Sequence, residues 1–509
     1  MPKRKREVGD AATKAPNAKV ARSVLSTGGF TSIQIITGSY NRVLHGVVAQ
    51  IPLASQIEDE TPTDGDSETT KVFFSDSFLF HAHSSALRCL ALSPAPPPSE
   101  NQTQKRLLAT GSTDERINIY QLSNAPPSTL KPQLPSINGA TLSENPKNRE
   151  VGSLLHHASS ITALHFPTRS KLLSAGEDST VAVTRTRDWT VLSTIKVPVP
   201  KIVGRPSGDT AGPGEVPAGV NDFAVHPSNK LMLTVSKGEK SMRLWNLVTG
   251  KKAGVLTFDR AVLQQAGEGK HGRGECRRLV WDEEGEEFAV CFERGVVTFG
   301  MDCKPKARIL PTPITKIHQI QYLPESFGKV LAVSTEDGRV ILYSTASPDE
   351  PTDSASNGEA KSVPEEHVAE KKTSSSDLPS CDLIGVVGGD SMAISGRIKD
   401  FQILEVPGQG KPSEDLILVT GSSDGTIRVC LISKTDLSEP SESPGTSGSE
   451  DASQPEREIG TFLESYETNH RITCLKAFVM TGKPDEEVED KEEWGGIEED
   501  DTQSSEESE

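Results

Sequence analysis

A hairpin pattern that recurs along the chain restricts the fold more than any other feature. At 416–431 the segment LILVTGSSDGTIRVCL runs through apolar residues to Asp424-Gly425 and then alternates apolar with polar side chains. An Asp-Gly pair suits a two-residue turn because glycine accepts a positive φ, and the alternation is typical of a strand with one buried face. Clearer or weaker copies occur at 107–122, 172–183, 231–247, 287–300 and 330–343. This repetition predicts an architecture built from one antiparallel unit.

Each of these hairpins is preceded by a short apolar strand. These strands lie at 87–92, 161–166, 220–225, 277–281, 314–323 and 397–404. A seventh such strand, at 472–478, has no hairpin after it, while two unassigned strand-like runs occupy 30–51. Pairing the two ends would make seven units and would remove an unpaired sheet edge. The sequence therefore predicts an all-β, seven-bladed β-propeller whose last blade is completed by N-terminal strands.

Composition predicts the domain boundaries. Residues 1–29 form a basic leader, 30–480 the propeller and 481–509 an acidic tail. Within the tail, residues 485–509 hold fourteen acidic residues and one lysine, so they carry −13 of the formal net charge of −18. Segments rich in Pro, Ser, Gly and Glu bury too little apolar surface to offset their ordering entropy, so they are predicted to be disordered insertions at blade edges. The insertions are placed at about 54–70, 123–150, 199–219, 344–389 and 433–457.

The cysteines and the hydropathy pattern exclude several classes of protein. The seven cysteines are scattered and odd in number, without metal-ligand spacing, which favours reduced core residues of an intracellular protein over a disulfide framework. No run of about twenty apolar residues predicts a membrane span, and no secretory signal is recognisable. The cluster Lys3, Arg4, Lys5 and Arg6 is a candidate nuclear-localisation signal, with a solvated charge run as the other interpretation.

With the repeats aligned, the chain resembles the WD-repeat family. The resemblance rests on TGSTDERINIY at 110–120, SAGEDSTVAV at 174–183, the segment around Trp245 and TGSSDGTIRV at 420–429. It implies a buried network of an early His, a middle-strand Ser or Thr, a turn Asp and a late Trp in each blade. The chain keeps partial sets: His157, Ser174 and Asp178; Asp114 with Tyr120; and Trp245 without a turn Asp.

A closer resemblance is to the p21-activated-kinase-interacting and maintenance-of-killer WD-repeat proteins. The blocks TGSYNRVLHGVVA, FHAHSSALRCLAL, LLHHASSITALHF, LWNLVTGKKAGVL and GRIKDFQIL carry it, in that order, over roughly 35–479. It implies a nuclear, nucleolar factor in assembly of the large ribosomal subunit, with kinase binding in some relatives. The end of the chain departs from relatives with a Lys-rich tail, since it reads EEWGGIEEDDTQSSEESE.

The polar residues of the repeats favour structure over catalysis. Asp114, Asp178, Asp337 and Asp424 recur in equivalent turns, where aspartate bonds its own loop amides, whereas a catalytic pair would be unique. His156-His157 lacks further ligands at metal spacing and is interpreted as structural. No phosphate loop or nucleophile elbow occurs. We expect a non-enzymatic protein without a cofactor or a metal.

The candidate partner-binding residues are cations near the starts of successive innermost strands. They are Arg88, Arg277, Arg278, Lys316, Arg397, Lys399 and Arg471. In a WD-repeat propeller these starts ring the narrow face around the channel, where positive charge would attract phosphate or an acidic helix. The other interpretation is a set of ordinary solvated charges. The acidic tail has two interpretations, a solvated terminus or a docking segment for basic ribosomal proteins or assembly factors. Trp494, which a solubilising tail does not need, marks a candidate short linear motif there.

The functional hypothesis is a monomeric scaffold within a larger assembly, bound to pre-60S particle proteins or to pre-rRNA and not to a membrane. The alternatives are a signalling adaptor that binds and inhibits a p21-activated kinase and a substrate receptor of a ubiquitin ligase. An enzyme is the third alternative.

Overall fold

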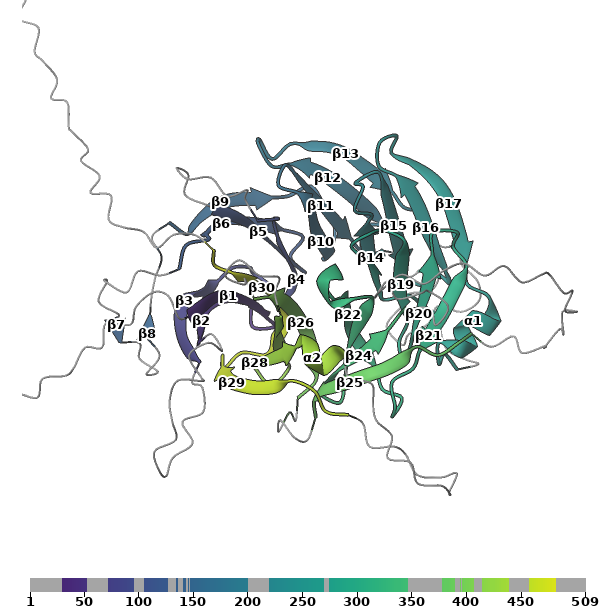
Figure 1. Ribbon diagram of the computed structural model, residues 1–509. Helices are drawn as coiled ribbons and strands as arrows, with labels where there is room; N and C mark the ends of the chain where they lie inside the picture. The colour runs from purple at the N-terminus through teal and green to yellow at the C-terminus, as the bar shows by residue number, and fades with distance from the viewer. Residues whose placement is uncertain are drawn as a thin grey trace, which may run out of the picture.

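The computed structural model describes residues 30–52, 72–95, 105–126, 134–135, 141–142, 145, 147–199, 219–269, 274–346, 378–389, 394, 396–406, 414–438 and 457–481. These residues form seven sheets, antiparallel except for the pairing of two short segments in the closing blade, arranged around a common axis (Figure 1). Each innermost strand contacts the innermost strand of the next sheet, and the last contacts the first. The chain therefore forms the seven-bladed propeller that the repeats predict.

Six blades follow one another along the chain, and in each the strands run in chain order from the innermost to the outermost. Blade 1 holds β4 (Leu87–Leu92), β5 (Lys105–Ser112), β6 (Ile117–Ser123) and β9 (Arg149–Leu154). Blade 2 holds β10 (Ile161–Thr168), β11 (Lys171–Gly176), β12 (Thr180–Arg185) and β13 (Val191–Lys196). Blade 3 holds β14 (Val220–Val225), β15 (Leu231–Ser236), β16 (Ser241–Asn246) and β17 (Lys251–Thr257).

The next three blades repeat the arrangement. Blade 4 holds β18 (Arg278–Trp281), β19 (Glu287–Cys291), β20 (Val296–Gly300) and β21 (Pro305–Ile309). Blade 5 holds β22 (Ile317–Tyr322), β23 (Val330–Thr335), β24 (Arg339–Ser344) and β25 (Asp382–Gly388). Blade 6 holds β26 (Ile398–Glu405), β27 (Asp415–Ser422), β28 (Thr426–Ser433) and β29 (Thr461–Glu467). Short helices α1 (Arg260–Gln265), α2 (Lys434–Ser438) and the 3₁₀ turn η2 (Glu325–Phe327) lie in the connections.

The closing blade joins the two ends of the propeller. Its innermost strand is β30 (Ile472–Val479), which pairs antiparallel with β1 (Phe30–Ser39), and β2 (Val43–Pro52) and β3 (Phe73–His81) follow outward. The purple β1 and the yellow-green β30 lie side by side in Figure 1. Two short strands from the connection of blade 1, β8 (Thr141–Leu142) and β7 (Leu134–Pro135), extend this sheet. The predicted closure by N-terminal strands is confirmed.

The structure corrects two of the predicted insertion boundaries. The insertion at 344–389 contains β25, because Val386 and Val387 are buried against β24 and complete blade 5. The insertion at 123–150 contains β7 and β8 and overlaps β9. Most of the other predicted insertions, the leader with Lys3–Arg6 and the tail with Trp494 lie outside the described residues, so their roles stay predictions.

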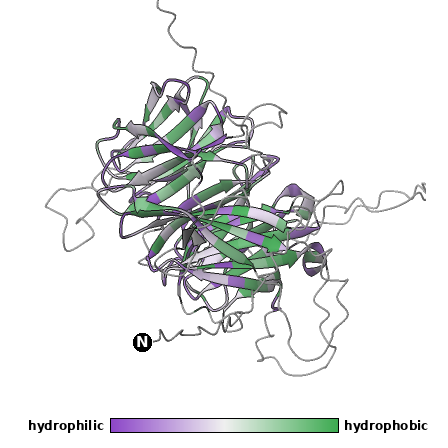
Figure 2. Ribbon diagram, turned by 90° about the vertical axis from the view of Figure 1, so that its left-hand side faces the viewer, coloured by the Kyte–Doolittle hydropathy of each residue, from purple (hydrophilic) through white to green (hydrophobic). Residues whose placement is uncertain are grey.

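Apolar side chains fill the spaces between neighbouring blades. Figure 2 shows the hydrophobic residues concentrated in the sheets, with hydrophilic residues frequent at the turns. At the seam between the closing blade and blade 1, Phe478, Leu44, Leu90 and Leu108 share one buried cluster. The seven cysteines are free, and four of them are buried, three in strands and Cys276 just before β18. No helix in the described ranges is long and apolar enough to span a membrane.

Two buried aspartates connect the innermost strands of successive blades. In β14 and β26 the register shifts at Asp222 and Asp400, which turns each carboxylate toward the next blade. Asp222 accepts the amide N–H of Leu279 at 3.0 Å, and Asp400 accepts the amide N–H of Leu475 at 2.9 Å. Because an innermost strand has a sheet partner on one side only, its other amide groups need acceptors. The aspartates supply them at two of the blade-to-blade contacts.

Candidate functional site

The candidate cations gather on the face at which the innermost strands begin. The turns between the second and third strands of each blade lie on the same face, since the strands within a blade alternate in direction. This surface is called the rim. It consists of six of the predicted cations together with three glutamates and one lysine from the turns: Arg88, Arg277, Lys316, Arg397, Lys399, Arg471, Glu177, Glu293, Glu336 and Lys237.

The glutamates pair with most of the rim cations. Glu177 lies 2.8 Å from Arg88 and 2.5 Å from Lys237. Burial raises the pKa of Glu177, but the hydrogen bonds from Lys237 and Arg88 lower it by more, so the carboxylate is held in its charged form. Over blades 1 to 3 the rim therefore alternates in charge.

The same pairing continues over blades 4 and 5. Glu293 lies 3.3 Å from Arg277 and 3.1 Å from Lys316, while Glu336 lies 3.0 Å from Arg397. Sequence reasoning missed these glutamates, although Glu177 and Glu336 directly precede turn aspartates in the repeated pattern. Their position in the repeat was the signal that could have found them.

Arg278 differs from the other predicted cations because it belongs to the interior of the channel. Its guanidinium lies 4.0 Å from the carboxylate of Asp222 and also approaches the carbonyl oxygen of His318 at 3.5 Å. Burial lowers the pKa of Arg278, and the charges of Asp222 and Asp400 raise it by more, so the residue stays protonated. It supports the strand contacts and is unsuited to a surface variant.

A net positive sector lies where blade 6 meets its two neighbours. Within the described ranges no acidic side chain forms a salt bridge with Lys399 or Arg471. Lys399 is half-buried, and its pKa is lowered by burial and by the nearby Arg397 and Arg471. Lys399 Nζ lies 3.4 Å from His318 Nε2, and burial together with this charge lowers the pKa of His318 to about 4. The imidazole is therefore neutral at physiological pH, and the net charge of the sector comes from Lys399 and Arg471, since Arg397 is paired with Glu336.

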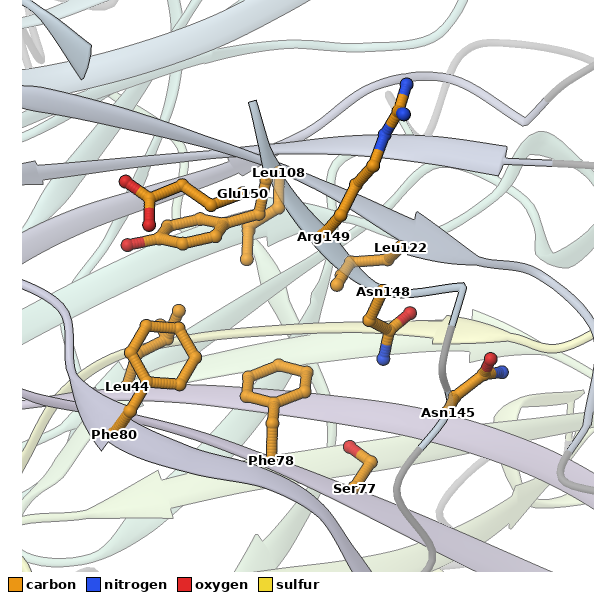
Figure 3. Close-up of a pocket in the computed structure, with 11 residues that line it drawn as sticks. Leu44, Ser77, Phe78, Phe80, Leu108, Leu122, Asn145, Asn148, Arg149 and Glu150 are labelled. Carbon is orange, nitrogen blue, oxygen red and sulfur yellow. The ribbon is translucent and has the colours of Figure 1, made fainter. Parts of the chain in front are cut away.

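Two cavities lie near these surfaces. One of about 630 Å³ opens at the mouth of the channel beside Arg88, Arg277, Glu293 and His318. The other, of about 290 Å³, is an apolar groove between the closing blade and blade 1, with Phe78 and Phe80 on one wall (Figure 3). Tyr120 lies in this groove, with its ring 5.5 Å from that of Phe80. The predicted grouping of Tyr120 with Asp114 is not observed as a hydrogen bond in the described part of the chain.

The residues predicted to form buried blade networks do so in blade 2. His157 Nδ1 lies 3.0 Å from the Asp178 carboxylate, and its Nε2 lies 2.8 Å from the Ser174 hydroxyl. In blade 1, Asp114 is joined to His83 and through it to Thr110, with contacts of 3.1 and 2.7 Å. The sequence reasoning did not single out His83, although it stands in the block FHAHSS that matches the position of His157.

The other predicted structural residues also bond within their own blades. Trp245 donates to Thr234 at 2.9 Å, Asp337 binds Arg339 at 2.6 Å, and Asp424 binds Arg428 at 3.3 Å. Each turn aspartate is thus engaged in local structure. The described residues contain no group of His, Cys, Asp and Glu side chains placed to hold a metal ion.

The stability contributed by the blade 2 network is expected to depend on pH. Burial raises the pKa of Asp178, but the hydrogen bonds from His157 and Thr180 lower it to about 2. A depressed folded-state pKa stabilises the fold above the unfolded value of about 3.9, and this contribution is lost as pH falls toward 2. Wild-type protein should therefore exceed Asp178→Asn in unfolding free energy by about 1 kcal/mol more at pH 6 than at pH 3. Urea titrations at both pH values measure this difference, and an equal gap at both would contradict it.

The family of the WD domain, G-beta repeat, matches residues 148–183, which run from β9 into β12 of the structure. This segment of the chain is therefore a WD repeat. The match covers the segment that holds His157, Ser174 and Asp178, so the network of blade 2 lies in the clearest repeat.

Over most of its length the chain is similar to curated relatives. A p21-activated protein kinase-interacting protein 1-like of Xenopus laevis is 24% identical over 451 residues, which are 89% of this chain and 83% of the relative. The protein of the same name from Danio rerio is 29% identical over 271 residues, with 53% and 54% coverage. Protein MAK11 of Saccharomyces cerevisiae is 28% identical over 335 residues, with 62% and 63% coverage. These relatives agree with the resemblance that the sequence blocks indicate.

Proposed function

We propose that this protein is a non-enzymatic scaffold in the assembly of the large ribosomal subunit, acting in the nucleus and nucleolus. The resemblance implies this process, and the similarity to MAK11 supports it. The structural observation that carries the proposal is the positive sector of Arg397, Lys399 and Arg471 at the channel mouth. It would receive a phosphate of pre-rRNA or an acidic helix of a pre-60S protein.

The physical form of the rim explains how such a scaffold would bind. Over blades 1 to 5 each rim cation already forms a salt bridge with a glutamate, whereas Lys399 and Arg471 form none within the described residues, so attraction for an anion would be strongest beside blade 6. Partial desolvation of Lys399 strengthens its field relative to a fully exposed lysine. Contacts to phosphate release counterions, so binding should weaken steeply as salt is raised.

Reversing the charge of the positive sector tests the proposal. The variant Arg397→Glu, Lys399→Glu, Arg471→Glu should move from pre-60S fractions to the top of a sucrose gradient of nuclear extract. A loss of about tenfold or more in co-sedimenting protein is expected, since several phosphate contacts or charge pairs are removed together. Arg278 is left intact because it packs against Asp222 inside the channel.

The matched control reverses three exposed lysines on outer strands and turns, Lys251, Lys252 and Lys304. It changes the net charge by the same amount and should sediment like wild type. Circular dichroism of both variants checks folding. Equal co-sedimentation of the sector variant and wild type would rule out the positive sector as the particle contact.

A second candidate function follows from the names of the relatives. Two of them are called p21-activated protein kinase-interacting protein 1-like, so an adaptor that binds such a kinase is the alternative. An adaptor would bind the purified kinase and remain outside the pre-ribosomal fractions. The sedimentation experiment thus separates the two functions, and a kinase pull-down with the same variants shows whether the positive sector serves both.

A further inference from the structure

An acidic pocket lies on the face opposite the rim, between blades 4 and 5. The innermost strand β18 begins at the rim and ends at Trp281, so the turn that follows it lies at the far end of the sheet. That turn carries Asp282, Glu283 and Glu284. Glu325, in the equivalent connection of blade 5, faces them, and its amide N–H donates to Glu283 at 3.0 Å.

These side chains enclose a cavity of about 120 Å³. Five acidic residues line it, Asp282, Glu283, Glu284, Glu287 and Glu325, and Tyr322 and Leu323 supply an apolar wall. Lys329 also lines the cavity. The cavity has room for the end of one long side chain and presents both carboxylates and an apolar surface.

The negative charge of the pocket is only partly compensated. Lys329 lies 3.9 Å from Glu284 and 3.7 Å from Glu286, and Lys306 lies 3.4 Å from Glu287. The pKa of Glu284 is raised, mainly by the neighbouring charge of Glu325. Carboxylates that raise one another's pKa in this way would gain from an added cation.

Asp282 provides an independent sign of a missing partner. Its side chain is buried, with 8% of the residue exposed, and it lines the cavity. One carboxylate oxygen accepts the amide N–H of Glu287 at 3.1 Å. The other, Oδ2, is buried without a hydrogen-bond donor. A buried carboxylate oxygen that lacks a donor is costly, and a donor brought in by a ligand would remove that cost.

We infer that this pocket receives an arginine side chain from a basic segment of a partner protein. A guanidinium donates from several nitrogens in a fixed fork, which matches Asp282 Oδ2 and the facing carboxylates at the same time. The aliphatic part of the side chain would lie against Leu323 and Tyr322. The pocket is separate from the rim, so the two surfaces can hold an anionic and a basic element of one assembly on opposite faces.

The inference is tested by measuring how tightly a fluorescent hexa-arginine peptide binds the full chain. Fluorescence anisotropy of the peptide reports binding, at low and at physiological ionic strength. Asp282→Asn keeps the turn hydrogen bond through its remaining oxygen, and Glu284→Gln is a second variant at the exposed edge of the pocket. Each should weaken binding by about tenfold or more, as expected for loss of a charge-assisted contact. Hexa-lysine should bind more weakly than hexa-arginine, and hexa-glutamine should not bind.

The matched control is Glu467→Gln, the same change at an exposed position on β29, which should leave the affinity unchanged. If it weakened binding as much as Asp282→Asn, the attraction would be general and the inference would fail. Equal affinity for hexa-lysine would overturn the assignment to arginine. A chain with Lys3, Arg4, Lys5 and Arg6 changed to glutamine should bind as wild type does. Tighter binding of the peptide by that chain would show that the leader occupies the pocket, and would overturn the inference that a partner protein does. None of these results depends on the sedimentation experiment.

Discussion

Asp400→Ala is expected to lower the free energy of unfolding by about 3–5 kcal/mol. The carboxylate is buried and accepts three hydrogen bonds: from the amides of Phe401 at 3.0 Å and Leu475 at 2.9 Å, and from the Gln319 side chain at 3.1 Å. Its loss leaves these donors without an acceptor where blades 5, 6 and the closing blade meet. Urea unfolding followed by tryptophan fluorescence measures the change.

Asp188→Ala is the control for this substitution. Asp188 lies at the surface and pairs with Arg185, so its removal should leave the unfolding midpoint almost unchanged. A loss below about 1 kcal/mol for Asp400→Ala would show that water replaces the carboxylate and that the aspartate does not join the blades.

Phe478→Ala should destabilise the protein by a similar amount, about 3–5 kcal/mol. The Phe478 ring is 1% exposed and packs with Ile36, Leu44 and Leu108 between the closing blade and blade 1. The guanidinium of Arg106 lies 4.7 Å from the ring centroid and would lose this contact as well. Because Phe478 lies on β30, which pairs with β1, the cavity would weaken the contact between blade 1 and the blade in which the two ends of the propeller meet.

The comparison is Phe462→Ala on β29, where the side chain is 40% exposed. It should cost less than about 1 kcal/mol. If both phenylalanine variants lost the same free energy of unfolding, packing at the contact between the closing blade and blade 1 would not be the cause of the loss. Thermal unfolding of the two variants alongside wild type gives the answer in one experiment.

The second and third strands of the blades were predictable because they repeat one physical pattern. Residues such as Ile427 and Val429 alternate with polar neighbours after an Asp-Gly turn, and both are fully buried on one side of β28. The orphan strand at 472–478 predicted the closing blade for the same reason, since an unpaired apolar strand needs a neighbour. The network of His157, Ser174 and Asp178 followed from the family pattern, and its members do meet.

The outermost strands could not be predicted from alternation. In β13 nearly all side chains are exposed, so neither face selects apolar residues. The strand β25 follows a long segment of low complexity, which concealed its short apolar run. The sequence pattern did not predict β3, because Phe73, Leu79 and Phe80 are all substantially exposed. The strand therefore lacks the alternation of buried apolar and exposed polar side chains.

The electrostatics of the rim were beyond sequence reasoning for another reason. Arg88 and Glu177 are far apart in the chain and belong to different blades, so their salt bridge depends on how the blades are placed around the axis. The arginines alone suggested a continuous positive arc. Only the three-dimensional arrangement shows that glutamates pair with some rim cations and not with others. Within the described residues, Lys399 and Arg471 form no salt bridge.

The pairing of β1 with β30 has a consequence for biosynthesis. The last residue of β1 is Ser39 and the first of β30 is Ile472, so the ribosome must add several hundred residues before the pair can form. At about 5–20 residues per second this takes roughly 20–90 s. Throughout that time the newly made β1 has one side without its strand, and Ile33, Ile35 and Ile36 lack the cover that they have in the finished ring. The closing blade can therefore be completed only after β30 has been made.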